Sequence, residues 1–220
     1  MTIIGISGSP VLNSNTDRAL RIALDATGEE TEFIKLSDYT YQPCRACLGC
    51  EETNVCILKD DATALAQKIR YADALIVAAY PPYGYLDGRT KSFLERLWCL
   101  RHKHGFLRGK PGGIIVTSAH PPENAVMSPS MEHAISSVKH FMMTEGMDVV
   151  GAVGVLGNVP CVVCGPGLDC PLSGVIKKYG PDAVRASIKI QQVEDQKDVI
   201  AALVAMGTEI GNRVRKSRCR

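Results

Sequence analysis

Short apolar runs alternate with amphipathic segments along most of this chain, and that alternation limits the folds it can adopt. Runs such as ALIVAA (74–79) and IIV (114–116) are apolar throughout, and turn-forming residues bound them. The segments between them carry apolar residues at helical spacing. Strands that are apolar on both faces and separated by helices predict a parallel sheet covered by helices on both sides.

Five strands are expected, which indicates a flavodoxin-like three-layer sandwich whose parallel sheet has strand order 2-1-3-4-5. The expected strands are residues 2–9, 31–38, 74–82, 112–122 and 148–157. The expected helices are 16–26, 60–73, 89–103 and 129–146, and an amphipathic stretch from about Pro181 to Val214 closes the chain.

Length and composition fit one globular domain over residues 1–220. The chain is 45% hydrophobic and 22% charged, with a net charge of +2. Its basic residues are dispersed, so we expect no nucleic-acid partner, and RVRKSRCR (213–220) is expected to be a solvated tail. No apolar run reaches the roughly 18 residues that a membrane span needs, and the N-terminus does not resemble a signal peptide. We therefore expect a cytoplasmic protein without a membrane partner. Segments 41–59 and 158–180 break the alternation and are expected to be loop excursions.

The segment PCRACLGCEETNVC (43–56) holds four of the nine cysteines. A disulfide knot, a zinc site and an iron–sulfur cluster are the three candidates. An odd cysteine count and a reducing compartment disfavour disulfides. Zinc sites normally use two separated cysteine pairs. Here C-x2-C-x2-C-x5-C places three thiols in overlapping turns, which favours three corners of a [4Fe–4S] cluster, with Cys56 returning as the fourth ligand. Zinc and unligated cysteines stay open as alternatives.

Three unusual loops follow the expected strands, at the carboxyl ends of the strands, where open α/β sheets bind ligands. The first, GSPVLNSNT (8–16), offers hydroxyl and amide side chains just before a helix N-terminus, which can hold a phosphate without a cation. The alternative is a turn that only caps the helix. Its candidate residues are Ser9, Ser14, Asn15 and Thr16.

The second loop, YPPYGYLDG (80–88), is stiffened by two prolines, and its tyrosines can lie along a flat aromatic ligand. The third, TSAHPPEN (117–124), adds a polar rim. An ordinary surface turn and a solvated histidine are the alternatives. A phosphate cradle, an aromatic ledge and a polar rim together predict a site for flavin mononucleotide (FMN). The candidate residues of these two loops are Pro82, Tyr83, Gly84, Tyr85, Thr117, Ala119 and His120.

The chain resembles the NADPH-dependent FMN reductase branch of the flavodoxin-like superfamily. GISGSP with SNT, YPPYGYLDGRTKSFLERL and IIVTSAH carry the resemblance, although the first loop lacks the basic residue usual there. With the cysteine motif added, the chain is similar to iron–sulfur flavoproteins. That resemblance implies that the three loops bind FMN and that the cluster ligands are Cys44, Cys47, Cys50 and Cys56.

The resemblance implies an FMN-dependent oxidoreductase or electron carrier. We expect a ferredoxin-like donor, a [4Fe–4S] cluster and FMN in sequence, and a small acceptor such as a quinone, dioxygen or peroxide. No side chain is expected to act as a nucleophile. A homodimer or homotetramer is expected, with the cluster of one chain near the flavin of another. The open alternatives are an NAD(P)H-dependent FMN or quinone reductase without a cluster, and an FMN- and metal-binding redox sensor without turnover.

The remaining cysteine group, CVVCGPGLDC (161–170), has only three thiols and no nearby fourth candidate. We expect a structured loop beside the flavin there, rather than a second cluster held by Cys161, Cys164 and Cys170.

Overall fold

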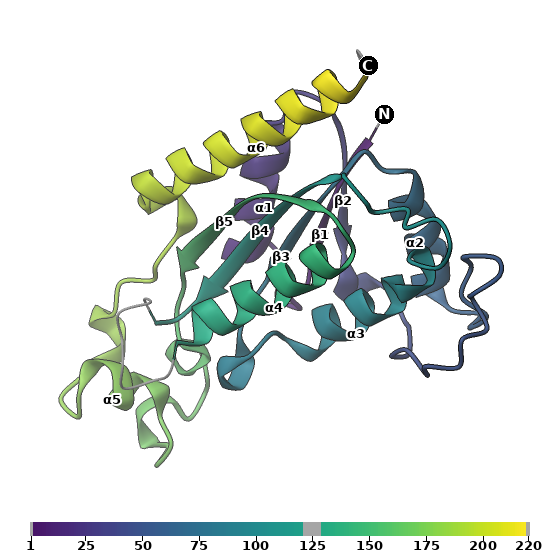
Figure 1. Ribbon diagram of the computed structural model, residues 1–220. Coiled ribbons are helices and arrows are strands. Elements are labelled where there is room, and N and C mark those ends of the chain that lie inside the picture. The colour runs from purple at the N-terminus through teal and green to yellow at the C-terminus, as the bar shows by residue number, and fades with distance from the viewer. Residues whose placement is uncertain (1, 121–128, 219–220) are drawn as a thin grey trace.

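A computed structural model describes residues 2–120 and 129–218, and Figure 1 shows a central sheet between two layers of helices. Five parallel strands form that sheet in the order β2-β1-β3-β4-β5. The predicted sheet and its strand order are therefore confirmed. The strands are β1 (Thr2–Ser7), β2 (Glu30–Lys35), β3 (Ala74–Ala79), β4 (Pro111–Ser118) and β5 (Asp148–Leu156).

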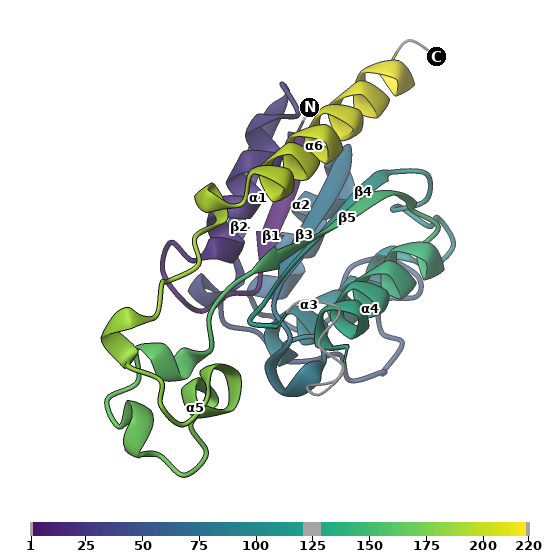
Figure 2. The same cartoon turned by 90° about the vertical axis from the view of Figure 1, so that its left-hand side faces the viewer.

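The helices cover both faces of the sheet, as the flavodoxin-like fold requires. Figures 1 and 2 show α1 and α6 on one face and α2, α3 and α4 on the other. The helices are α1 (Asn15–Asp25), α2 (Asp61–Tyr71), α3 (Gly88–Arg96), α4 (Ser130–Thr144), α5 (Gly174–Tyr179) and α6 (Lys197–Arg218).

Alternation of side chains along the inner strands builds a separate core on each face. Ile4 and Ile6 of β1 pack under α2, α3 and α4, whereas Ile3 of the same strand packs under α1 and α6. All six residues of β3 are buried. A central strand with no solvated face explains why the sequence of β3 is apolar without interruption.

Helix α6 lies against α1 with almost no space between the two backbones. A Cβ added to Gly207 would lie 2.1 Å from the carbonyl oxygen of Ala23, and one added to Gly211 would lie 2.0 Å from that of Thr27. The amphipathic stretch expected from Pro181 becomes an α-helix only at Lys197. The described part of the basic C-terminus is the last part of α6 rather than a free tail, because Arg213 pairs with Glu209 and Asp148.

Between β5 and α6 the chain makes a long excursion below the carboxyl ends of the strands (Figure 2). This excursion contains α5 and a small core of its own, formed by Val159, Val162 and Val175. Within the described residues, no helix is long and apolar enough to cross a membrane.

Candidate functional site

A cavity of about 1080 Å³ opens at the carboxyl ends of the strands. The first loop, the 80–84 segment, the end of β4 and residues 157–160 and 190–192 surround it. Of the eleven residues predicted to contact FMN, Tyr85 alone does not line it. The ten that do are Ser9, Ser14, Asn15, Thr16, Pro82, Tyr83, Gly84, Thr117, Ala119 and His120.

The first loop turns sharply into α1, and Ser14 is the N-cap of that helix. The Ser14 hydroxyl accepts a hydrogen bond from the Asp17 amide (3.1 Å), and the Asp17 carboxylate accepts one from the Ser14 amide (3.1 Å). This reciprocal pair is a capping box. The capping alternative is thus realised at Ser14, which also lines the cavity.

A buried ion pair lies beneath the first loop. Lys35, at the end of β2, places its Nζ 2.6 Å from the Asp17 carboxylate and donates a second hydrogen bond to the Val11 carbonyl (2.9 Å). The Ser7 hydroxyl also donates to Asp17 (2.6 Å). The first loop lacks a cation of its own, but Lys35 brings one beneath it. Sequence reasoning missed Lys35, whose signal was a lysine next to the buried Ile34 in the second expected strand.

Arg18 on α1 is a second cation of the cavity that sequence reasoning missed. Its Nε lies 2.6 Å from the Glu194 carboxylate, and its guanidinium also donates to the side chains of Asn15 and Gln192. The hydrogen bond from Arg18 lowers the pKa of Glu194. Asn15 in turn donates to the Gln191 carbonyl (2.8 Å). These contacts join the first loop to a segment more than 170 positions away in the sequence.

The two tyrosines of the second loop have different environments. Tyr83 has a left-handed φ of 53°, and its side chain is fully exposed at the cavity mouth. Tyr85 instead stacks on His133 of α4, with ring centroids 5.0 Å apart and an interplanar angle of 8°. Tyr85 therefore belongs to a separate groove between α3 and α4, which has a volume of about 580 Å³.

Thr117, at the end of β4, lines the cavity and has a buried hydroxyl without a partner among the described residues. Next to it, Lys178 from α5 donates to the Ala119 carbonyl. Burial, and then the charge of Lys178, lower the pKa of His120. A buried donor left unpaired costs free energy unless a ligand pairs with it, so this rim fits a bound molecule. The rest of the 117–124 loop, from Pro121, lies outside the described residues.

The cysteine segment forms a second, smaller cavity of about 130 Å³ beside α3. All four motif cysteines line it, together with Ala46, Leu48 and Trp98 among other residues. Left-handed φ angles of 51° at Ala46 and 59° at Leu48 curl the chain, and the Ala46 amide lies 3.4 Å from Cys44 Sγ. Backbone donors around sulfur suit a negatively charged cluster. Within residues 2–120 and 129–218, no three metal-binding side chains converge on a position for a single metal ion.

Arg96 at the end of α3 anchors this segment from below. Its guanidinium forms a two-pronged ion pair with Asp60 (2.6 and 2.9 Å) and also donates to Cys56 Sγ (3.3 Å). Burial opposes the charge of Asp60, but hydrogen bonds from Arg96 and Gln42 outweigh it and lower the pKa of Asp60. Sequence reasoning missed Arg96, although a charged residue three positions after the buried Phe93 was a usable signal.

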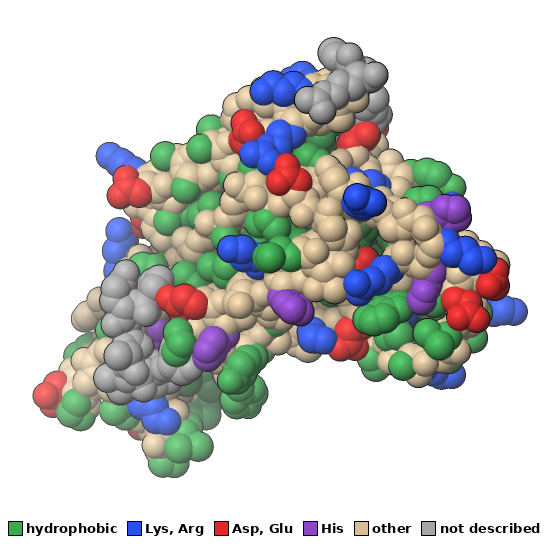
Figure 3. Space-filling view, in the orientation of Figure 1, with side chains coloured by type: hydrophobic (Ala, Val, Ile, Leu, Met, Phe, Trp, Pro, Cys, Tyr) green, Lys and Arg blue, Asp and Glu red, His purple; other side chains and the backbone are tan. Residues whose placement is uncertain are grey.

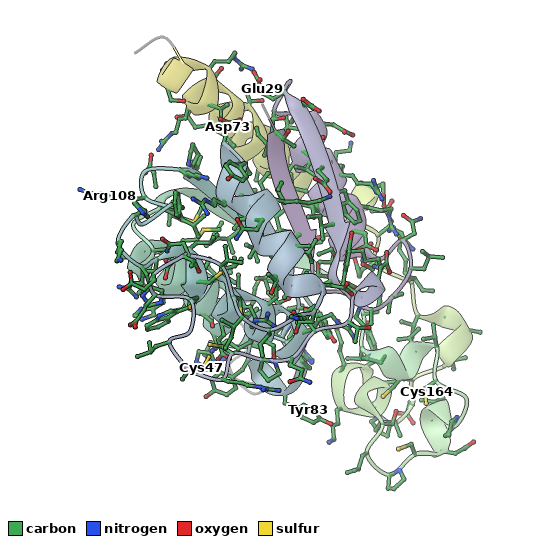
Figure 4. The ribbon with its side chains drawn as sticks, turned by 90° about the vertical axis from the view of Figure 1, so that its right-hand side faces the viewer. Glu29, Cys47, Asp73, Tyr83, Arg108 and Cys164 are labelled. Carbon is green, nitrogen blue, oxygen red and sulfur yellow. The ribbon has the colours of Figure 1, made fainter. Side chains whose placement is uncertain are left out.

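The three cysteines of the 158–180 excursion lie apart from the motif. Figure 4 shows Cys47, Tyr83 and Cys164 at the same end of the molecule, with Tyr83 between the two cysteines. Cys164 is exposed, whereas Cys161 is half-buried and accepts a hydrogen bond from the Gly174 amide (3.2 Å). The two cysteine groups are therefore separate.

Comparison with known proteins agrees with this geometry. Residues 1–153 match the family model of NADPH-dependent FMN reductase. An iron-sulfur flavoprotein of Methanosarcina thermophila is 32% identical over 162 residues, which cover 72% of this chain and 82% of that protein. One from Methanocaldococcus jannaschii is 35% identical over 155 residues, covering 69% and 76% of the two chains.

Among solved structures, RosB with a bound 8-demethyl-8-formylriboflavin-5'-phosphate intermediate has a TM-score of 0.62 at 18% identity. The match covers 98% of this chain and 81% of that one, and at this identity it shows a shared fold alone. The family match over most of the chain carries the assignment, together with the sequence identity to two iron-sulfur flavoproteins. The chain therefore belongs to the iron–sulfur flavoproteins of the NADPH-dependent FMN reductase family, and it is an FMN-dependent oxidoreductase.

Proposed function

We propose that this oxidoreductase takes electrons from a ferredoxin-like donor through a [4Fe–4S] cluster to FMN and passes them to a small acceptor such as a quinone, dioxygen or peroxide. The observation that carries the proposal is that all four motif cysteines line one cavity, separate from the larger cavity at the strand ends. A cluster supplies single electrons, and FMN exchanges either one or two. In this proposal, residues 1–220 form a single domain with 41–59 as its cluster insertion.

For FMN, the first loop supplies the phosphate site. Ser9, Ser14, Asn15 and Thr16 line the cavity at the N-terminus of α1, where backbone N–H groups and the helix dipole favour an anion. Lys35 supports this loop, although its charge is balanced by Asp17. Tyr83 at the mouth and the unpaired Thr117 hydroxyl would contact the ring system.

For the cluster, Cys44, Cys47, Cys50 and Cys56 are the proposed ligands. Leu48, Ile57, Leu58 and Trp98 complete the cavity with apolar surface, and Cys44 and Cys47 themselves are exposed in the single chain. Backbone donors at Ala46 and the guanidinium of Arg96 would offset the negative charge that four thiolates bring together.

The apolar surface around the cysteine segment supports self-association. Figure 3 shows hydrophobic side chains gathered at the lower right of the molecule, where this segment lies in Figure 1. Leu48 is 54% exposed, Ile57 56% and Trp98 48%. Apolar residues grouped in this way are typical of an interface. We propose that a second copy of the chain covers them in a homodimer or homotetramer, with its flavin near this cluster.

The test uses protein purified under anaerobic conditions. Iron, acid-labile sulfide and FMN are measured per chain, and reduced ferredoxin and NADPH are then compared as electron donors with a quinone as acceptor. We expect about four iron atoms for a cubane cluster, about one FMN, and faster turnover with ferredoxin. Protein with FMN but without iron and sulfide would contradict the cluster.

A second candidate follows from the family itself, whose description names NADPH as the reductant. In that case the chain is an NAD(P)H-dependent FMN or quinone reductase, and its cysteines hold no cluster. Rapid NADPH oxidation by iron-free protein would support this candidate over the first. Protein that binds both groups but turns over with neither donor would instead be a redox sensor.

A further inference from the structure

Arg96 is the largest fully buried side chain among the described residues, and it lies directly beneath the cysteine segment. We propose that Arg96 raises the reduction potential of the cluster through its hydrogen bond to Cys56, and that Asp60 limits this effect. The proposal rests on the cluster site proposed above. It assigns to Arg96 and Asp60 a role in setting the potential, beyond holding the loop.

The hydrogen bonds of Arg96 are divided between the cluster segment and its surroundings. Nη1 donates to the Gln42 carbonyl (2.8 Å) and to Asp60 (2.6 Å). Nη2 donates to Asp60 (2.9 Å), to the Thr63 hydroxyl (3.1 Å) and to Cys56 Sγ (3.3 Å). The guanidinium plane is therefore fixed, and one of its N–H groups points at a proposed cluster ligand.

Charge explains the direction of the effect. Reduction adds one electron to the cluster and makes it more negative. A cation and an N–H donor beside a ligand sulfur stabilise the more negative state, so they raise the reduction potential. The effect is strong here because the Arg96 side chain is only 1% exposed, and a buried charge is poorly screened by water.

Asp60 acts in the opposite direction, because its carboxylate balances the guanidinium charge. Asp60 is also the N-cap of α2 and accepts a hydrogen bond from the Gln42 amide (3.1 Å). Substitution by asparagine keeps an acceptor oxygen at this position and suits a helix N-cap. Asp60→Asn therefore removes the balancing charge and keeps the acceptor oxygen that the Gln42 amide and Nη1 of Arg96 use, whereas Nη2 of Arg96 loses its Asp60 acceptor.

The experiment measures the cluster potential in Arg96→Gln, Arg96→Lys and Asp60→Asn. Electron paramagnetic resonance follows an anaerobic redox titration of each variant, and the flavin of the same sample is the internal reference. Arg70→Gln is the matched control, because it removes a guanidinium that stacks on the Phe106 ring, 3.9 Å from its centroid. Iron and sulfide are measured on every sample first.

At the wild-type midpoint, we expect Arg96→Gln to lower the ratio of reduced to oxidised cluster at least tenfold, a shift of about 59 mV for one electron. Arg96→Lys keeps the positive charge but loses the planar guanidinium that holds several hydrogen bonds at once. It should therefore lower the ratio of reduced to oxidised cluster by a smaller factor. Asp60→Asn should raise the ratio. Arg70→Gln should leave it unchanged, and no variant should move the flavin potential.

A role limited to anchoring the loop predicts a different pattern. If Arg96→Gln and Asp60→Asn keep full iron but shift the cluster potential in the same direction, or not at all, the proposal is wrong. If Arg96→Gln loses its iron, the opposite shifts expected of Arg96→Lys and Asp60→Asn still decide the question. Wild-type protein without iron and sulfide would refute the cluster site itself, and the metal analysis identifies that case before any potential is measured.

Discussion

At Gly8 the first loop of the flavin cavity runs against the start of α3 with no space for a side chain. A Cβ there would lie 1.9 Å from Thr90 Oγ1 and 2.8 Å from Asp87 Oδ2. Both neighbours are buried, so neither can move aside easily. We expect Gly8→Ala to lower the free energy of unfolding by about 1–3 kcal/mol. The displaced loop should also bind FMN about tenfold more weakly, a loss of about 1.4 kcal/mol.

Urea unfolding and fluorescence titration of FMN measure the two effects. Gly88→Ala is the matched control, because a Cβ at Gly88, the first residue of α3, would meet nothing within 4 Å. In a helix, alanine is more favourable than glycine by up to about 1 kcal/mol, so the control should be neutral or stabilising. Equal behaviour of the two variants would show that the close approach at Gly8 does not matter.

Cys47→Ser tests the cluster ligands directly. We expect this variant to lose most of its iron and to keep its FMN, because the cysteine segment and the flavin cavity have separate linings. Iron, sulfide and FMN are measured per chain after anaerobic purification. If both groups were lost equally, the two loops would fold as one unit, and the assumption of independence would be wrong.

The matched control is Cys164→Ser in the 158–180 excursion. Cys164 is exposed and lies across Tyr83 from Cys47 in Figure 4. We expect its replacement to leave the iron content near that of a single cubane, about four per chain. A wild-type content near eight, reduced by half in Cys164→Ser, would mean that the excursion holds a second cluster.

Individual side chains show where sequence reasoning reached its limit. Ser14 and Thr16 could be placed at the cavity because they follow a strand and lie at the start of a helix. Arg18 and Lys35 could not, because their partners come from other elements. Tyr85 was expected beside the flavin, but it stacks on His133. The direction of that side chain depends on the left-handed turn at Tyr83, which local sequence does not specify.

At the scale of elements, the inner strands were predictable because burial on both faces of the sheet leaves a continuous apolar pattern, as in β3. The chain between β5 and α6 was less predictable. Its small core depends on Val159, Val162 and Val175, which are separated by short turns without a helical or strand period. A six-residue helix such as α5 is too short to give a periodic signal.

Lys110 joins two elements and gives the fold a dependence on pH. Its Nζ donates to the carbonyls of Ile69 (3.3 Å) and Arg70 (2.7 Å) at the end of α2, just before β4 begins. Burial lowers the pKa of Lys110 from 10.5 to about 8, against an opposing effect of Asp73. Between about pH 8 and 10.5 the unfolded chain therefore binds more protons at this site than the folded chain, so stability should rise with pH.

The comparison is between the wild type and Lys110→Met. Relative to the variant, the unfolding free energy of the wild type should increase from pH 8 to 10, as the cost of burying a charged lysine disappears. Urea unfolding at several pH values measures this difference, and the contributions of other lysines cancel in it. Parallel curves for the two proteins would show that Lys110 keeps its ordinary pKa in the fold.

At the scale of the whole molecule, the question is whether a cluster passes electrons to the FMN of its own chain or to the FMN of a neighbouring chain. Cys47 of the cysteine segment and Tyr83 of the flavin cavity lie at the same end of the molecule (Figure 4), but the two cavities share no lining residue. We expect the working pair to form between chains. A mixture of Cys47→Ser chains with Asn15→Ala/Thr16→Ala chains should then recover electron transfer from cluster to flavin, which stopped-flow absorbance can follow.

Recovery requires that both parents keep the oligomeric state of the wild type, and light scattering checks this. The second parent must also retain its iron, because only its FMN site is altered. If transfer does not recover in such a mixture, cluster and flavin of the same chain form the pair. The apolar surface at Leu48, Ile57 and Trp98 would then need another partner.

The contact between α6 and α1 has a consequence for how such proteins diversify. Gly207 and Gly211 hold the final helix against α1, and β5 ends at Leu156, where the intervening span begins. Both ends of the span are fixed. The conformational entropy lost in closing a flexible loop between fixed ends grows only with the logarithm of the loop's length. The family match ends at residue 153, just before this span. We therefore expect residues 157–196 to tolerate a change of length, which would alter the part of the cavity lining that Gly157, Asn158 and Gln191 supply while the sheet stays intact.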